Sequence, residues 1–248
     1  MSLAYGAGRF VACADGGLSA STDGLTWTPV PLDAHYWHID LSCTGKEFVA
    51  TGCITSRTCE VILTSADGVS WETRYQRVGL AAFDQVAYGN GRYVVSFGNA
   101  AWTWSSADLT NWTTVNTLLF LALTFDQGMF VAADADEGTI RTSADGVEWT
   151  EVFHPDQPVY ISDLAYGGGR FVAVGGTNSG PRRAVVLTSG DGRQWSLQVQ
   201  EEAEGLVRVV YGAGRFVANS EAALAVSEDG TGCRVQVLRG DEVRARRI

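Results

Sequence analysis

The sequence predicts an all-β protein, a single six-bladed β-propeller with four antiparallel strands in each blade. Two observations support this: a short turn signature recurs six times, and a glycine-rich signature alternates with it along the chain. Copies of the first signature begin 44, 41, 37, 46 and 38 residues apart, a mean of about 41. A period of roughly 40–45 residues is typical of one four-stranded propeller blade. Helical periodicity is nearly absent, so no long helix is expected in the core.

The first signature reads Ser-x-Asp, usually followed by glycine and, three residues later, by tryptophan. The aspartate can accept backbone N–H groups of the next residues, and the glycine allows a left-handed backbone. Tryptophan then opens the following strand with a large apolar body. A turn-closing role is favoured over a metal-binding or catalytic role, because the aspartate repeats with the blade. The six copies are Ser21–Trp27, Ser65–Trp71, Ser106–Trp112, Ser143–Trp149, Ser189–Trp195 and Ser227–Cys233.

The second signature is a glycine turn between two apolar strands, as expected of a β-hairpin. Its copies are Tyr5–Phe10, Cys43–Phe48, Tyr88–Tyr93, Phe125–Phe130, Tyr166–Phe171 and Tyr211–Phe216. Each repeat is therefore predicted to contain strand a, the glycine turn, strand b, a variable loop, strand c, the Ser-x-Asp turn and strand d. In the fifth repeat these strands are predicted at Ile161–Tyr166, Phe171–Gly175, Ala184–Ser189 and Trp195–Val199.

The blades are expected to occupy consecutive segments of one domain, residues 1–238: 1–32, 33–76, 77–115, 116–155, 156–201 and 202–238. The first blade would begin with strand a at Ser2–Tyr5, and the sixth would end with strand d at about Arg234–Leu238. No sheet would then mix N- and C-terminal strands, and apolar packing of blade six on blade one would close the ring. The tail, residues 239–248, is expected to be disordered or to add a fifth strand.

The Ser-x-Asp turns resemble the Asp-box, or bacterial neuraminidase, repeat, whose usual form is Ser-x-Asp-x-Gly-x-Thr-Trp. The copies here are one residue shorter between aspartate and tryptophan. The resemblance covers essentially the whole chain and implies a sialidase-like propeller. It says little about function, since the family includes sialidases, other glycosidases, receptors and assembly factors. The sialidase Arg-Ile-Pro motif does not occur, so the resemblance supplies no catalytic residue.

Composition narrows the classes of partner. The formal net charge of −10 argues against nucleic acid or an anionic membrane surface, which are held largely by Lys and Arg. No apolar run approaches the roughly 20 residues that span a bilayer, so no membrane insertion is expected. The first residues show no signal-peptide pattern, and the compartment is left open between the cytoplasm and a secreted or phage particle. No cofactor-binding motif is present, and a monomer without cofactor is expected.

A binding site is expected where the repeats differ, in the b–c loops and the crossovers between blades, which share one face. There Trp37 and His38, with Tyr160, are predicted to line a ligand pocket near the channel mouth. The alternative is that this crossover is a solvated loop and Trp37 covers a blade edge. His35, His38 and His154 share the face, but a metal site is not favoured, because blades two and five lie opposite one another.

Charged residues of strand a form a second candidate group. Asp40, Asp84 and Asp163 are interpreted as occupying matching positions, with Arg208 in the sixth repeat. They could form an acid/base or sugar-binding group. Hydrogen bonding between blades is the favoured interpretation.

Two long b–c loops add further candidates. Arg182 and Arg183 could bind a carboxylate or phosphate, or could lie on an exposed loop tip. Cys53 and Cys59 could bridge the ends of strands b and c, although an odd count of five cysteines does not favour this.

These features favour a non-catalytic recognition module that binds a glycan or a protein through the variable face. One alternative is a glycoside hydrolase or lyase that uses Asp40, Asp84 or Asp163 with His38. Another is an intracellular assembly scaffold with a broad apolar patch.

Overall fold

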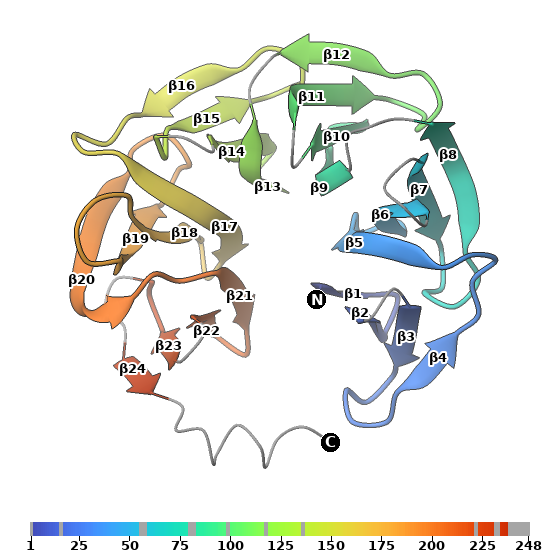
Figure 1. The fold of residues 1–248 in the computed structure, drawn as a ribbon, viewed down its shortest axis with the longest axis horizontal. Coiled ribbons are helices and arrows are strands. Elements are labelled where there is room, and N and C mark those ends of the chain that lie inside the picture. Colours follow the sequence, from blue (N-terminus) through green and yellow to red (C-terminus); the bar gives the residue numbers. More distant parts are fainter. Residues whose placement is uncertain are drawn as a thin grey trace. The chain divides into compact units, whose positions relative to one another are not determined.

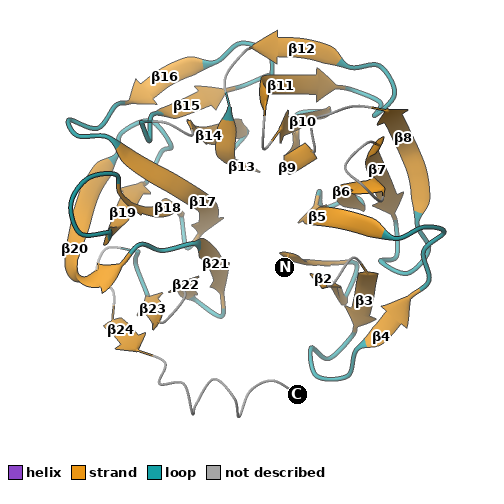
Figure 2. Ribbon diagram, in the orientation of Figure 1, coloured by secondary structure: helices purple, strands orange, loops and turns teal. Residues whose placement is uncertain are grey.

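The computed structural model describes residues 2–14, 17–54, 59–78, 83–97, 100–116, 119–134, 137–220, 223–230 and 234–237. These residues contain 24 strands and no helix (Figures 1 and 2). In the described part of the chain, then, no helix is long and apolar enough to cross a membrane.

The strands form six four-stranded antiparallel sheets, each built from consecutive strands. The first two sheets are β1 (Ser2–Gly6), β2 (Arg9–Ala14), β3 (Gly17–Ser21) and β4 (Thr28–Val30), then β5 (Tyr36–Cys43), β6 (Phe48–Ile54), β7 (Cys59–Ser65) and β8 (Glu72–Val78). The next two are β9 (Phe83–Gly89), β10 (Arg92–Phe97), β11 (Ala100–Ser106) and β12 (Thr113–Asn116), then β13 (Phe120–Asp126), β14 (Met129–Asp134), β15 (Ile140–Ser143) and β16 (Thr150–Phe153). The last two are β17 (Val159–Gly167), β18 (Arg170–Thr177), β19 (Arg183–Ser189) and β20 (Ser196–Glu204), then β21 (Arg208–Gly212), β22 (Arg215–Asn219), β23 (Ala223–Ser227) and β24 (Arg234–Val237).

This architecture confirms the predicted fold class, a six-bladed β-propeller. The N-terminal strand β1 pairs within its own sheet, so none of the described sheets combines β1 with β24. The fifth-repeat strands extend beyond the predicted bounds, most clearly at β20, which runs five residues past Val199 to Glu204. The tail, residues 239–248, lies outside the described residues.

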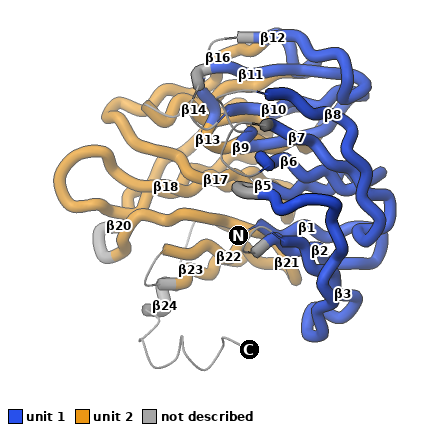
Figure 3. Tube along the Cα trace, turned by 45° about the vertical axis from the view of Figure 1, so that its right-hand side comes forward, with its two compact units in different colours: residues 1–120, 128–130, 144–148 blue, residues 121–127, 131–143, 149–248 orange. Residues whose placement is uncertain are grey.

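The chain divides into two compact units (Figure 3). The first comprises residues 1–120, 128–130 and 144–148, and the second residues 121–127, 131–143 and 149–248. Within the first unit, sheets pack through buried side chains such as Val11, Phe48 and Leu63. Within the second, Val172 and Val186 of the fifth blade pack against Phe216 of the sixth. Both cores are therefore formed by side chains on facing sheets.

Strand pairing gives every blade two distinct ends, seen clearly in the fifth blade. Gly167 pairs with Arg170, and Thr188 with Ser196, at what we call the turn end, which carries the glycine turn and the Ser-x-Asp turn. Val159 pairs with Thr177 at the other end, the loop end, which carries the b–c loop and the incoming crossover. Within the blade, the repeated turns and the variable segments are thus separated, as predicted.

The glycine after the signature tyrosine allows neighbouring blades to approach closely. A Cβ atom at Gly167 would lie 2.0 Å from the ring of Tyr211 in the next blade. Any larger side chain would push the two strands apart, so glycine here is required by packing.

Candidate functional site

The Ser-x-Asp turns use their aspartates internally, as the turn at Ser65 shows. The backbone N–H groups of Val69 and Ser70 donate to Asp67 Oδ1 at 2.8 and 2.7 Å. Ser65 Oγ donates to the same oxygen at 3.0 Å and accepts the Gly68 N–H at 2.8 Å. The backbone hydrogen bonds lower the pKa of Asp67 to about 2.

Equivalent hydrogen bonds lower the pKa values of Asp23, Asp108 and Asp191. The contacts support the turn-closing role of these aspartates. Among the described residues, no group of three or more His, Cys, Asp or Glu side chains is arranged to hold a metal ion.

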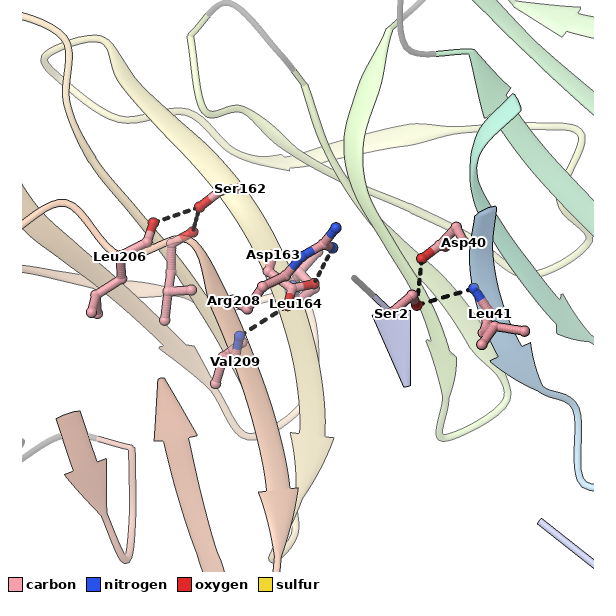
Figure 4. A network of polar contacts seen from close by, with 10 residues as sticks. Ser2, Asp40, Leu41, Ser162, Asp163, Leu164, Leu206, Arg208 and Val209 are labelled. Carbon is pink, nitrogen blue, oxygen red and sulfur yellow. Dashed lines mark hydrogen bonds and ion pairs between the residues drawn. The ribbon is translucent and has the colours of Figure 1, made fainter. Parts of the chain in front are cut away.

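In the first unit, strand a makes a polar contact between blades (Figure 4). Ser2 Oγ donates to Asp40 Oδ1 at 2.9 Å and accepts the Leu41 N–H at 3.1 Å. A small polar side chain of the first blade therefore binds both the carboxylate and the backbone of the second.

The second unit repeats this contact with a carboxylate in place of the hydroxyl (Figure 4). Asp163 Oδ2 accepts the Val209 N–H of the next blade at 2.9 Å, and Oδ1 accepts the Leu164 N–H at 3.0 Å. Arg208 Nη1 lies 4.0 Å from Asp163 Oδ1, a long ion pair. Burial raises the pKa of Asp163, and the Val209 hydrogen bond opposes that shift most. Both described aspartates thus join adjacent blades.

The interpretation of Asp84 as a third matching residue is wrong. Phe83 pairs with Phe97 and Gln85 with Ser96, so Asp84 is the extra residue of a β-bulge. In β17 the extra residue is Ser162, and Asp163 follows it. The residue that matches Asp163 is therefore Gln85, which is buried. Asp84 therefore matches Ser162 and stands one position before the residue that matches Asp163.

Tyr160 is already packed by its own blade. Its hydroxyl lies so near Gly176 and Gly205 that a Cβ atom at either glycine would come within 2.5 and 2.1 Å of it. The Arg182 guanidinium carbon lies 4.9 Å from the centre of the tyrosine ring, within cation–π range. Two of the predicted ligand-binding residues, Tyr160 and Arg182, thus lie together, and they contact each other.

Trp37 and His38 lie in β5, and their side chains are outside the described residues. The same holds for the side chain of Cys59. The backbone register pairs Cys53 with Glu60 and Cys59 with Ile54. A pocket at Trp37 and the Cys53–Cys59 bridge both stay predictions.

The second unit contains a pocket of about 630 Å³ that extends from the loop end of the fifth blade along the beginning of β20. Three segments far apart in the sequence form it: the crossover after β16, the b–c loop after β18, and the beginning of β20. Its lining residues are Phe153, His154, Pro155, Asp156, Gln157, Pro158, Val159, Thr177, Ser179, Pro181, Arg183, Leu197 and Val199.

The walls of this pocket are held by fixed backbone. Three of the five prolines in the chain line it, and proline restricts its own φ angle. Thr177 Oγ1 donates to the Pro181 carbonyl at 2.9 Å and accepts the Arg183 N–H at 3.1 Å, which closes the b–c loop. Thr139 Oγ1 and His154 Nδ1 share a hydrogen bond of 3.1 Å that ties the crossover to the fourth blade. The pocket is thus largely preformed.

Sequence reasoning identified Arg183 and the b–c loop as candidates, and the structure places both at this pocket. It missed the apolar walls, in particular Phe153, Leu197 and Val199. The clustering of prolines in the variable segments was the available signal, since three of the five fall in one crossover and one loop.

No known family model matches the chain, and no curated protein matches its sequence. Among solved structures, a chain in the crystal structure of a nidogen/laminin complex is similar, with a TM-score of 0.63 and 12% identity over 93% of each chain. At this identity the similarity supports the propeller fold and nothing finer. It does not confirm the Asp-box resemblance. The propeller fold is compatible with a protein-binding module.

Proposed function

We propose that this protein is a non-catalytic recognition module that binds a protein partner through the pocket at the loop end of the fifth blade. One observation carries the proposal: a preformed pocket of about 630 Å³ lies among the segments in which the repeats differ. Ligand sites are typically concave, mainly apolar and few per protein.

The pocket lining favours a protein segment over a sugar. Six of the thirteen lining residues are aliphatic or proline, and Phe153 is the single Phe, Tyr or Trp residue among them. Sugar recognition typically uses open aromatic faces, and the ring of Tyr160 is covered by Arg182. An apolar side chain from a partner would bury well against Leu197 and Val199. The similar solved structure is of a protein–protein complex, which is consistent with this proposal.

The contacts of strand a argue against the glycosidase alternative. A glycosidase needs two carboxyl groups facing one open cleft. Asp40 and Asp163 instead bind the adjacent strands within their own units. Their hydrogen bonds support a structural role.

The proposal is tested with random nine-residue peptides displayed on phage, selected against the wild-type protein and counter-selected against Val199→Asp. Val199 lines the pocket and is 39% exposed, so a carboxylate there changes the pocket wall with little effect on folding. Val78→Asp, at an 82% exposed position of β8, is the matched control. Selected peptides should bind Val199→Asp at least about 10-fold more weakly than wild type and Val78→Asp equally well. Failure to select any peptide that depends on Val199 would overturn the proposal.

A glycan array and a panel of chromogenic glycosides test the alternatives with the same protein. Glycan binding that is lost in Val199→Asp would reassign the pocket to sugars. Glycoside turnover that Asp40→Asn abolishes would show an enzyme. The proposal predicts neither.

A further inference from the structure

We propose that the outer edge of β20 is a strand-addition site, at which an extended segment of the partner protein pairs with Ser196–Gln200 and places an apolar side chain in the adjacent pocket. This inference rests on the proposed function and names the form in which the partner binds. An unpaired strand edge offers backbone donors and acceptors that an extended peptide can satisfy.

Among the strands that the structure describes, none pairs with this edge of β20. The sheet order is β17-β18-β19-β20, and β20 pairs with β19 on its inner side (Figure 1). β20 has nine residues, the greatest length among the outermost strands that the structure describes. Ser196 and Gln198 are exposed, and Val199 is 39% exposed. The edge is therefore long enough for several backbone hydrogen bonds.

The composition of this edge differs from that of the other outer strands. Natural proteins block sheet edges with short strands, charges or proline. β4 has three residues including Pro29, and β8 carries Glu72, Arg74 and Arg77. β12 is uncharged but has four residues, and β16 and β24 are equally short and each carries a charge. The glutamates of β20, Glu201, Glu202 and Glu204, all lie in its second part. Its first five residues, Ser196–Gln200, read Ser-Leu-Gln-Val-Gln and contain no charge or proline.

The pocket lies on one face of this same segment. Leu197 and Val199 both line the pocket, as side chains two residues apart on a strand share a face. A strand added beside β20 would direct every second side chain to that face, about 5 Å from its neighbour. One apolar side chain of the added strand would then lie beside Val199 and enter the pocket. The predicted partner is thus an extended, uncharged segment with apolar side chains at alternate positions.

The experiment uses the Val199-dependent peptides selected above, with the full-length protein. Amide hydrogen exchange is measured with and without peptide, and each peptide is resynthesised with single backbone N-methyl groups at successive positions. Alternate amides of Ser196–Gln200 should exchange at least about 10-fold more slowly in the complex, while those of the β8 edge should not change. N-methylation should weaken binding by about 10-fold or more at every second peptide position.

The outcomes separate this inference from the proposed function. Peptides that depend on Val199 but leave the β20 amides unprotected and tolerate N-methylation at every position would overturn strand addition alone. Absence of any Val199-dependent peptide would overturn both. Protection of β20 together with alternate N-methyl sensitivity would support both.

Discussion

At the residue scale, single side chains close the repeated turns. Each described Ser-x-Asp turn satisfies backbone N–H groups that have no partner in a strand. Five of the six copies have glycine after the aspartate, and the fourth position of the third copy is Leu109. The contribution of these side chains to stability can be measured at the regular turn that contains Asp67 and at the exceptional turn that contains Leu109.

Replacing Asp67 by Asn tests the regular turn. At pH 7 the variant should unfold a few degrees below wild type, because a neutral amide oxygen accepts the Val69 and Ser70 N–H groups less strongly than a carboxylate. The pKa of Asp67 falls from 3.8 to about 2 on folding, so its stabilisation is present above about pH 4 and is lost toward pH 2. Thermal unfolding at several pH values should show the difference between the proteins shrinking over that interval. A difference that stays constant in acid would contradict the role of the carboxylate.

Leu109 tests the exception. Its φ angle is +64°, a left-handed backbone that disfavours side chains, yet its side chain is only 1% exposed in an aromatic core. Leu109→Ala should lose burial and keep the strained backbone, whereas Leu109→Gly should lose burial and relax it. We therefore expect the Gly variant to be about 1 kcal/mol more stable than the Ala variant, the reverse of the usual order. Denaturant unfolding of the two variants measures this, and a more stable Ala variant would refute the explanation.

At the element scale, an arginine of the second blade pairs with a buried carboxylate of its own sheet and contacts an aromatic ring of the third blade. Arg77 of β8 donates from Nε and Nη2 to the two carboxylate oxygens of Glu60 at 3.0 and 3.2 Å. Glu60 is 1% exposed. The Arg77 guanidinium carbon lies 4.4 Å from the ring centre of Trp104 in the next blade. One arginine thus links a buried carboxylate to an aromatic side chain of another sheet.

Removing the Arg77 side chain should lower the free energy of unfolding. Arg77→Ala leaves Glu60 buried without its counter-charge, and we expect a loss of about 2–3 kcal/mol, given that Arg77 is partly exposed. The double variant Glu60→Leu/Arg77→Met should recover most of that loss, because it removes the charges and keeps much of the volume. Urea unfolding of the single and double variants provides the comparison. Equal stability of Arg77→Ala and wild type would show that the pair contributes nothing.

The strands could be predicted from the sequence because both signatures specify tight hairpins, and a hairpin determines which residues pair on either side of it. The mismatch of Asp84 was also visible in the sequence, because Asp84 stands four residues before Tyr88 whereas Asp163 stands three before Tyr166. Two departures from the repeat are explained by one contact between them. Glu47 stands where four of the other five copies have arginine, and Tyr93 stands where the other copies have phenylalanine. The Tyr93 hydroxyl donates to Glu47 Oε1 at 2.5 Å.

The pocket escaped prediction for a different reason. Its walls come from the segments around Phe153, Pro181 and Val199, which lie in three parts of the chain. In the sequence, each of these three segments looks like an ordinary loop or outer strand. Their juxtaposition follows from the topology of the fifth blade and from its contact with the crossover after β16. Arg183 was identified because paired arginines in a long b–c loop could bind a carboxylate or phosphate.

At the scale of the whole molecule, stability and recognition depend on different segments of the chain. The repeated turns, present in every blade, stabilise the fold, while the segments that differ between blades supply the pocket. We propose that ligand binding is confined to the fifth-blade pocket and the adjoining edge of β20.

Methyl-resolved NMR tests this claim most directly, since a chain of 26.6 kDa labelled at Val and Leu methyl groups is well within its range. The protein is titrated with a Val199-dependent peptide. The account predicts that the methyl signals of Val159, Leu197 and Val199 shift with peptide concentration, while those of the exposed Leu25 and Val78 stay unchanged. Shifts at Leu25 or Val78 with unchanged signals at Val159 and Leu197 would contradict it.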